Sequence, residues 1–373
     1  MLSMRRNKFT SSMNMYTNER PRSRSSAPSR VNGWPAVHRL ASMLKSVPKE
    51  KQDVIRKLWR HVNKKRIRLE RLGGQNRHSG RGFVIDGHTV VDGLTKRMED
   101  LLSDYSPYTC TGKLRFMKAP LALLLSDESI QQSLKTCQKN DKAFPSCKEI
   151  RGNPMQHGSK VHNEVYNAVR HAIRIAKIYT DNRPLPRNFD VDVCTNACLL
   201  SMVKFGLAPF SSEWPAFYEK DTGCATAADI LALDVNDHFK MTIVELKTGS
   251  VVQAMRTPRE GQAQWNGMLS AVIQNVTTAA MCRVCYGPEF FSWSDTTSCV
   301  IYARPWGCVK IEIPPALWSP AIAGRLCRIL AERKRGSLRE TIPEKNNQQS
   351  FNTSKGKKRI RAPKTFEVGF RKS

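Results

Sequence analysis

The chain has 373 residues, enough for one large domain or two small ones, and a formal net charge of +29. The charge lies mostly at the ends: residues 1–80 contain 20 Lys and Arg against 4 Asp and Glu, and residues 332–373 contain 13 against 4. A bilayer-spanning helix needs about 20 consecutive apolar residues, and the sequence has no such run, so no membrane span is expected.

The charge distribution predicts three regions. Residues 1–80 form a basic, largely disordered region with one helix, residues 81–331 form a globular domain, and residues 332–373 form a basic, disordered tail. Basic appendages favour polyanions, of which nucleic acid is the commonest. The eleven cysteines are odd in number, in a chain too large to need disulfides. They indicate reduced thiols and an intracellular protein.

The N-terminal region leaves two interpretations open. Residues 1–36 are rich in Arg, Ser and Asn, which is typical of a basic tail and also of a mitochondrial transit peptide. Nuclear, mitochondrial and virus-encoded proteins would look alike here. An imperfect apolar stripe predicts a helix at Val47–Leu72, either solvated or contacting DNA, and glycines after it indicate a linker.

The remaining elements follow from apolar periodicity and turn residues. Their order predicts an α/β domain with a central mixed sheet and helices on both faces. Helices are expected at 98–105, 120–138, 158–179, 193–207, 261–274 and 314–333, and strands at 213–218, 225–233, 241–246, 280–286 and 299–313.

The most informative stretch is the hairpin within residues 222–249. Two apolar strands flank the turn at 234–238, and folding about this turn puts Asp229 opposite position 244 or 245. Glu245 and Lys247 are two apart and share a face. Two carboxylates and an ammonium would therefore meet on an apolar hairpin. The alternative is an ordinary amphipathic hairpin whose charges face water.

Such a group of side chains suits a hard divalent cation. Two nearby carboxylates repel unless a cation lies between them, and Mg²⁺ takes oxygen ligands of this kind. The ion can activate a water molecule and neutralise charge on a phosphate. Lys247 would place a positive charge near the attacking water or the phosphate.

These residues carry a family resemblance. Asp229 with Glu245-Leu246-Lys247 resembles the core of the PD-(D/E)XK nuclease superfamily, particularly its exonuclease branch of RecB-like nuclease domains, phage lambda exonuclease and the mitochondrial genome maintenance exonuclease. The resemblance extends from about Gly158 to Ile313. Three further motifs match in order: Gly158-Ser-Lys-Val-His162, Ser212-Glu213-Trp214-Pro215 and Gln262-Ala263-Gln264-Trp265.

The resemblance implies a restriction-endonuclease-like fold and a metal-dependent deoxyribonuclease, an exonuclease more than an endonuclease, acting in replication, recombination or repair. It implies that DNA is the partner and that Mg²⁺ or Mn²⁺ is the cofactor. The implied roles are metal binding by Asp229, Glu245, the Leu246 carbonyl, His162 and Glu213, water activation by Lys247, support from Gln262, and DNA contacts by Arg256, Arg259 and Gln264.

Each assignment has a plainer alternative. His162 could be a packed or capping residue, Glu213 a rim charge, and Gln262 an ordinary polar residue at a helix start. Glu164 lies two positions after His162 and projects elsewhere on the helix. Cys282 and Cys285 fall in an expected strand, where positions three apart face opposite sides, which argues against an iron–sulfur cluster or zinc site. The whole chain could instead be an inactive DNA-binding scaffold or a nucleic-acid packaging protein.

Overall fold

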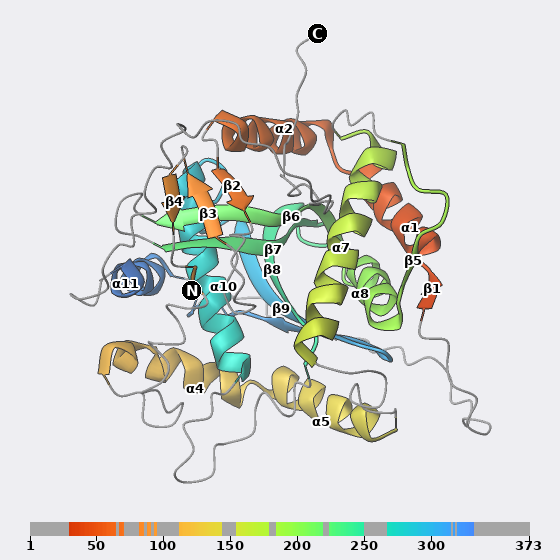
Figure 1. The fold of residues 1–373 in the computed structure, drawn as a ribbon. Helices are drawn as coiled ribbons and strands as arrows, with labels where there is room; N and C mark the ends of the chain where they lie inside the picture. Colours follow the sequence, from red (N-terminus) through yellow and green to blue (C-terminus); the bar gives the residue numbers. More distant parts are fainter. Residues whose placement is uncertain are drawn as a thin grey trace, which may run out of the picture.

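The computed structural model describes residues 30–64, 67–70, 82–85, 88–90, 93–94, 112–143, 154–178, 184–218, 224–249, 267–314, 316–317 and 319–331. Within these residues the chain is an α/β protein with a five-stranded mixed sheet flanked by helices (Figure 1). The coarse fold class expected from the sequence is therefore confirmed. The helix expected at 98–105 and both charged ends, 1–29 and 332–373, lie outside the described residues.

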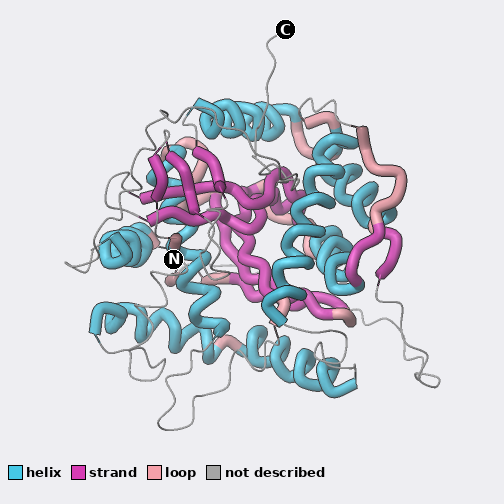
Figure 2. The backbone as a smooth tube through the Cα atoms, viewed as in Figure 1, coloured by secondary structure: helices cyan, strands magenta, loops and turns pink. Residues whose placement is uncertain are grey.

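The five strands run in the order β10–β9–β8–β7–β6, and the tube in Figure 2 shows them as one curved magenta layer. Only β8 and β9 pair in parallel, and the connection between them contains α10. The other three pairs are antiparallel. The strands are β6 (Leu207–Tyr218), β7 (Cys224–Asp234), β8 (Lys240–Lys247), β9 (Thr296–Arg304) and β10 (Gly307–Glu312).

The expected hairpin is confirmed as β7 and β8. Ile230 pairs with Val244 and Asp234 pairs with Lys240, so the next position along the ladder puts Asp229 opposite Glu245. At the turn, the Asn236 amide donates a hydrogen bond of 2.9 Å to the Asp234 carboxylate, as expected for an Asx turn. All the residues of β8 except the first and the last are buried, so the strand lies in the core.

Helices cover both faces of the sheet. On β7, Thr226 Oγ1 lies 3.5 Å from Thr278 Oγ1 of α10 (Gly267–Tyr286), whereas Asp229, on the other face, lies beside α7 (Pro154–Ala176). Figure 1 shows α10 on one side of β8 and β9, and α7 and α8 (Val193–Lys204) on the other. The apolar face of α7 is buried, as expected: Val161, Val165, Ala168, Val169, Ala172 and Ile173.

The segment before residue 65 contributes to the core, which differs from the expected division at residue 80. Strand β1 (Arg30–Asn32) pairs with β5 (Asp190–Asp192), and α1 (Trp34–Lys45) packs against α7 and α8. Helix α2 (Lys49–Lys64) is shorter than expected, because the chain continues as β2 (Ile67–Glu70), part of a small sheet with β3 (Gly82–Ile85) and β4 (His88–Val90). The buried residues of α1 and α2 include Leu40, Leu44, Ile55, Leu58 and Trp59.

Two of the expected strands are wrong, since residues 299–313 form the antiparallel pair β9 and β10 and not a single strand. Residues 280–286 form the second half of α10 and not a strand, and this helix is buried along much of its length. Cys282 and Cys285 are therefore three apart on a helix and share a face, contrary to the sequence argument. Both thiols are buried, but neither belongs to a group of three possible metal ligands among the described residues.

The remaining helices lie at the periphery. They are the 3-10 helix η1 (Gly112–Met117), α4 (Lys118–Ser126), α5 (Glu128–Ala143) and α11 (Pro320–Ala331), which packs on α10. The single helix expected at 120–138 is thus divided near Asp127. Among the described helices, none is long and apolar enough to cross a membrane.

Candidate active site

Three side chains from separate elements converge beside the sheet. His162 comes from the third turn of α7, Glu213 from the middle of β6 and Asp229 from β7. One possible ligand atom of each lies within 4.8 Å of those of the other two, and all three residues are partly exposed. A cation could therefore reach them from solvent.

Helix α7 comes close to the end of β8 because residue 158 is a glycine. A Cβ placed on Gly158 would lie only 3.0 Å from Thr248 Oγ1, just beyond Lys247. A larger residue would push the helix away from the strand. His162 is one turn further along α7 and lies close to the carboxylates of β6 and β7. This gives the Gly158-x-x-x-His162 spacing a structural meaning.

The backbone at Glu213 is unusual for a residue within a strand. Ser212 pairs with Ile230 and Trp214 with Ala228, so Glu213 lies opposite Asp229. Its φ is +52°, in the left-handed region that L-residues with side chains avoid. Such strain costs about 1–3 kcal/mol and is concentrated at functional sites in proteins. Here it occurs at a carboxylate close to Asp229 and His162.

The two oxygens of Asp229 have different neighbours. Oδ2 accepts a hydrogen bond of 2.8 Å from the Leu246 amide of the adjacent strand. Oδ1 lies 3.6 Å from His162 Nδ1. The Leu246 amide thus fixes the carboxylate and leaves Oδ1 on the side where Glu213 and His162 converge. The predicted ligand on Leu246 is its carbonyl, whose role stays a prediction.

Glu245 and Lys247 form a close pair at the edge of this group. Lys247 Nζ lies 2.5 Å from Glu245 Oε1 and 3.3 Å from Gln274 Oε1 on α10. The Glu245 side chain is only 2 % exposed, whereas that of Lys247 is 33 % exposed. Lys247 therefore connects a buried carboxylate to the solvent-accessible side of the site.

Burial and neighbouring charges shift the pKa values of both members of this pair. Burial, and to a lesser extent the Asp229 carboxylate, raise the pKa of Glu245 from 4.5 to about 7 against the opposing effects of Lys247 and His162. Burial by itself would lower the pKa of Lys247, but the charges of Glu245 and Asp229 outweigh it and raise this pKa. A bound cation would reduce the repulsion between the two carboxylates.

Four residues that the sequence predicts at the site are not among the residues that the structure describes. Gln262, Gln264, Arg256 and Arg259 lie outside the described residues. Glu164 points elsewhere, as expected: its Oε2 accepts 2.7 Å hydrogen bonds from the Asp192 amide and from Thr195 Oγ1.

Sequence reasoning missed Gln274, the described glutamine that contacts Lys247. No spacing in the sequence distinguishes it from Gln262 and Gln264. Its position becomes evident only from where α10 crosses β8. No protein-family model, curated protein or solved structure matches this chain.

Proposed function

We propose that this protein is a metal-dependent deoxyribonuclease of the PD-(D/E)XK type, with a restriction-endonuclease-like sheet, and that it acts as an exonuclease in DNA replication, recombination or repair. The observation that carries the proposal is the convergence of His162, Glu213 and Asp229 next to the Glu245–Lys247 pair. These five residues come from four elements and span 86 positions of the sequence, counted from 162 to 247.

The donor set fits Mg²⁺ or Mn²⁺. Asp229 and Glu213 offer carboxylate oxygens, which hard cations prefer, and His162 adds an imidazole nitrogen that suits Mn²⁺ better than Mg²⁺. Glu245, opposite Asp229, offers a third carboxylate. A bound ion would supply Lewis-acid activation of water and neutralise charge on the scissile phosphate.

The side chains of the protein would bind the ion and orient the groups that act on the water and the phosphate. Asp229 and Glu213 would hold the ion, with Asp229 fixed by the Leu246 amide. Lys247, held between Glu245 and Gln274, would present its ammonium to the attacking water or to the phosphate. Gln274 keeps this ammonium in place and thereby orients it. The strained Glu213 backbone supports a role in the site over a rim charge.

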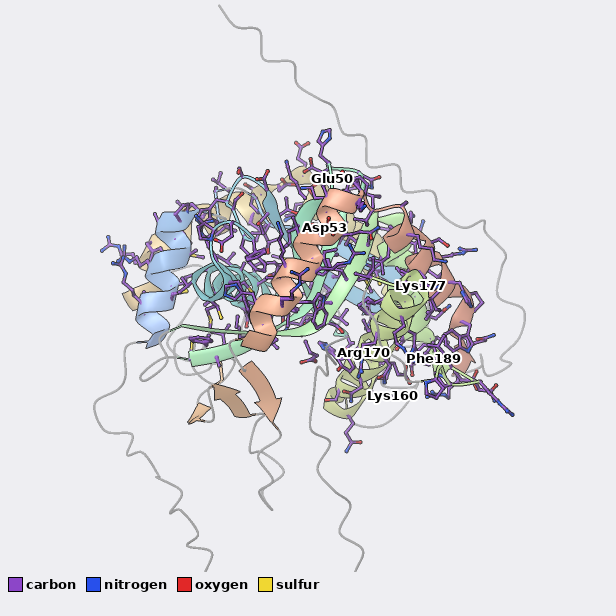
Figure 3. The ribbon with its side chains drawn as sticks, turned by 90° about the horizontal axis from the view of Figure 1, so that it is seen from above. Glu50, Asp53, Lys160, Arg170, Lys177 and Phe189 are labelled. Atoms are coloured by element: carbon purple, nitrogen blue, oxygen red, sulfur yellow. The ribbon has the colours of Figure 1, made fainter. Side chains whose placement is uncertain are left out.

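The charge of the molecule suits a DNA substrate. The net charge of +29 would attract the phosphate backbone and favour rapid encounter. Basic side chains also lie along the helix that carries His162: Figure 3 labels Lys160 and Arg170 on α7, and Lys177 just beyond its end. An inactive scaffold or a packaging protein would not require Asp229, Glu245 and Lys247 together, so both alternatives are less well supported.

The proposal is tested by incubating the full-length protein with end-labelled linear duplex DNA and with a covalently closed circle. We expect Mg²⁺-dependent release of nucleotides from the linear duplex, little cleavage of the circle, and no reaction with a chelator present. Asp229→Asn should abolish cleavage and leave DNA binding intact.

The matched control is Asp237→Asn, which removes a carboxylate from the turn of the same hairpin, where it pairs only locally with Lys240. This variant should cleave as the wild type does. Cleavage by Asp229→Asn at the wild-type rate, or cleavage that is insensitive to the chelator, would refute the proposed nuclease site. Cleavage of the circle would agree with a nuclease but contradict the assignment as an exonuclease.

A further inference from the structure

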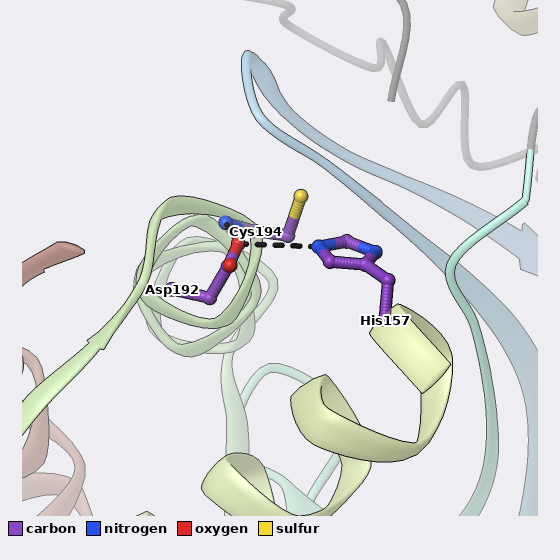
Figure 4. A group of neighbouring side chains, drawn as sticks. All are labelled: His157, Asp192 and Cys194. Atoms are coloured by element: carbon purple, nitrogen blue, oxygen red, sulfur yellow. Dashed lines mark hydrogen bonds and ion pairs between the residues drawn. The ribbon is translucent and has the colours of Figure 1, made fainter. Parts of the chain in front are cut away.

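A second cluster of possible metal ligands lies near the start of α7. His157 is in the first turns of α7, Asp192 ends β5, and Cys194 is in the first turn of α8 (Figure 4). One possible ligand atom of each lies within 4.8 Å of those of the other two. The three residues bring an imidazole nitrogen, a carboxylate oxygen and a sulfur to one point.

This cluster is more buried than the candidate active site. Cys194 is fully buried, and the side chains of Asp192 and His157 are 1 % and 11 % exposed. His157 Nε2 lies 3.4 Å from Asp192 Oδ1, and Figure 4 shows the imidazole pointing at the carboxylate with the thiol beside them. Lys160 Nζ contacts the other oxygen, Oδ2, at 3.2 Å.

Part of this arrangement has a local explanation. Asp192 caps α8, because its Oδ1 accepts a 3.0 Å hydrogen bond from the Cys194 amide. The cap and the ion pair with Lys160 account for the carboxylate. They give no reason for an imidazole and a thiol to lie beside the same carboxylate, since neither is needed to cap a helix.

The donor atoms indicate which cation would bind. Mixed nitrogen, oxygen and thiolate donors are characteristic of Zn²⁺, whereas Mg²⁺ and Ca²⁺ prefer oxygen alone. We propose that His157 Nε2, Asp192 and Cys194 Sγ hold a Zn²⁺ ion. Binding would release the Cys194 thiol proton, and the thiolate and carboxylate together would balance the two charges of the ion. Lys160 can remain on Asp192 Oδ2, with the metal on Oδ1.

The ion would have a structural role. It would join the first turns of α7 to the junction of β5 and α8, where Glu164 already accepts hydrogen bonds from Asp192 and Thr195. His162 lies between these two attachment points on α7. The Zn²⁺ site would therefore fix the helix that carries His162, but the inference does not rest on nuclease activity.

The test uses Co²⁺ as a spectroscopic replacement for Zn²⁺ in the full-length protein after removal of bound metal. A thiolate ligand gives a sulfur-to-cobalt charge-transfer absorption, which the candidate active site cannot produce because none of its described ligands is a sulfur. We expect this absorption to saturate at one equivalent of Co²⁺ and to disappear when Zn²⁺ is added. Zn²⁺ should also raise the melting temperature.

Cys194→Ala should lose the absorption and the thermal shift. Cys198→Ala is the matched control, since it removes a buried thiol one turn later on α8, and it should keep both. His157→Gln, which keeps the thiolate, should weaken Co²⁺ binding at least about tenfold.

The proposal would be overturned by no charge-transfer absorption in the wild type, by the same absorption in Cys194→Ala, or by unchanged Co²⁺ affinity in His157→Gln. The His157→Gln result decides the question even if Cys194→Ala does not fold. An absorption lost equally in Cys198→Ala would also count against Cys194 as the ligand.

Discussion

At Glu245 the requirements of stable folding and of the proposed chemistry conflict. The chemistry needs a charged carboxylate at a position where burial disfavours the charge. The Glu245 carboxyl is buried beside Asp229, and its pKa is raised from 4.5 to about 7. The folded protein therefore holds this proton more tightly than the unfolded chain does. As the pH rises from about 4.5 through 7, the unfolded state is favoured by the difference, and the contribution of this group to stability falls.

Glu245→Gln should remove this pH dependence. In the presence of a chelator, the variant should match the wild type near pH 4.5 and exceed its free energy of unfolding at pH 8 by up to about 3 kcal/mol, because the pKa of Glu245 is about 7 in the folded protein. Denaturant unfolding of both proteins at the two pH values measures the difference. The same variant should lose activity, because Lys247 loses its carboxylate partner.

Adding Mn²⁺ should narrow the gap at pH 8, since a bound cation stabilises the wild-type carboxylate and has less effect on the amide. A stability difference that is the same at both pH values would show that Glu245 is ionised without cost, and would remove the electrostatic argument for a cation here.

At the scale of single residues, the sequence predicts the charged residues of the candidate site better than it predicts the residues that position them. Asp229, Glu245 and Lys247 interrupt apolar strands, so the hairpin register alone brings them together. The position of Gln274 depends on how α10 crosses β8, and the strained Glu213 backbone depends on the conformation of β6 at that residue. Neither follows from spacing in the sequence.

At the scale of elements, the contact between α7 and β8 holds His162 near the hairpin carboxylates. Gly158→Ala would put a Cβ 3.0 Å from Thr248 Oγ1. Alanine favours a helix over glycine by about 1 kcal/mol, so stability should not fall much. A small displacement of α7 should still lower the cleavage rate between about tenfold and a hundredfold.

Thr248→Ala provides the compensating change, because it removes the oxygen that the new Cβ would meet. The single variant should cleave at nearly the wild-type rate, and the double variant should recover most of the activity lost in Gly158→Ala. If the double variant stayed as slow as Gly158→Ala, the close approach at residue 158 would not explain the glycine.

The elements missed or mistaken in the sequence have identifiable physical causes. Pro35 lies in the first turn of α1, where proline is well tolerated, but beside Gly33 it resembles a loop signal. Residues 276–286 contain Val, Thr, Cys and Tyr, which favour strands, yet they form α10 because burial between the sheet, α2 and α11 overrides local propensity. In the turn of the hairpin, by contrast, local propensity and the observed structure agree.

At the scale of the whole molecule, the α/β class follows from the order of elements, but the extent of the core does not. The basic composition before residue 65 hides β1, which pairs with β5, and the helices α1 and α2, whose apolar residues belong to the same core as the sheet. A truncation that tests the charged ends must therefore stop before Arg30.

Removing residues 1–29 and 332–373 deletes 19 of the 61 Lys and Arg and 5 of the 32 Asp and Glu. The melting temperature should change little, because every described contact of the core is retained. DNA affinity should fall, and the slope of log affinity against log salt concentration should become shallower, because fewer counterions are released. Fluorescence anisotropy across a salt series measures both. An unchanged slope would mean that the ends do not contact DNA.

In the proposed mechanism, Lys247 acts on the reacting phosphate or water at a metal-dependent site. The most direct measurement is single-turnover cleavage of linear duplex DNA at saturating Mg²⁺ by Lys247→Ala and by Lys240→Ala. The two lysines are at opposite ends of β8, and Lys240 pairs with Asp237 in the turn. Lys247→Ala should lower the rate at least about a hundredfold while Lys240→Ala leaves it unchanged; a Lys247→Ala protein that cleaves at the wild-type rate would contradict the assignment.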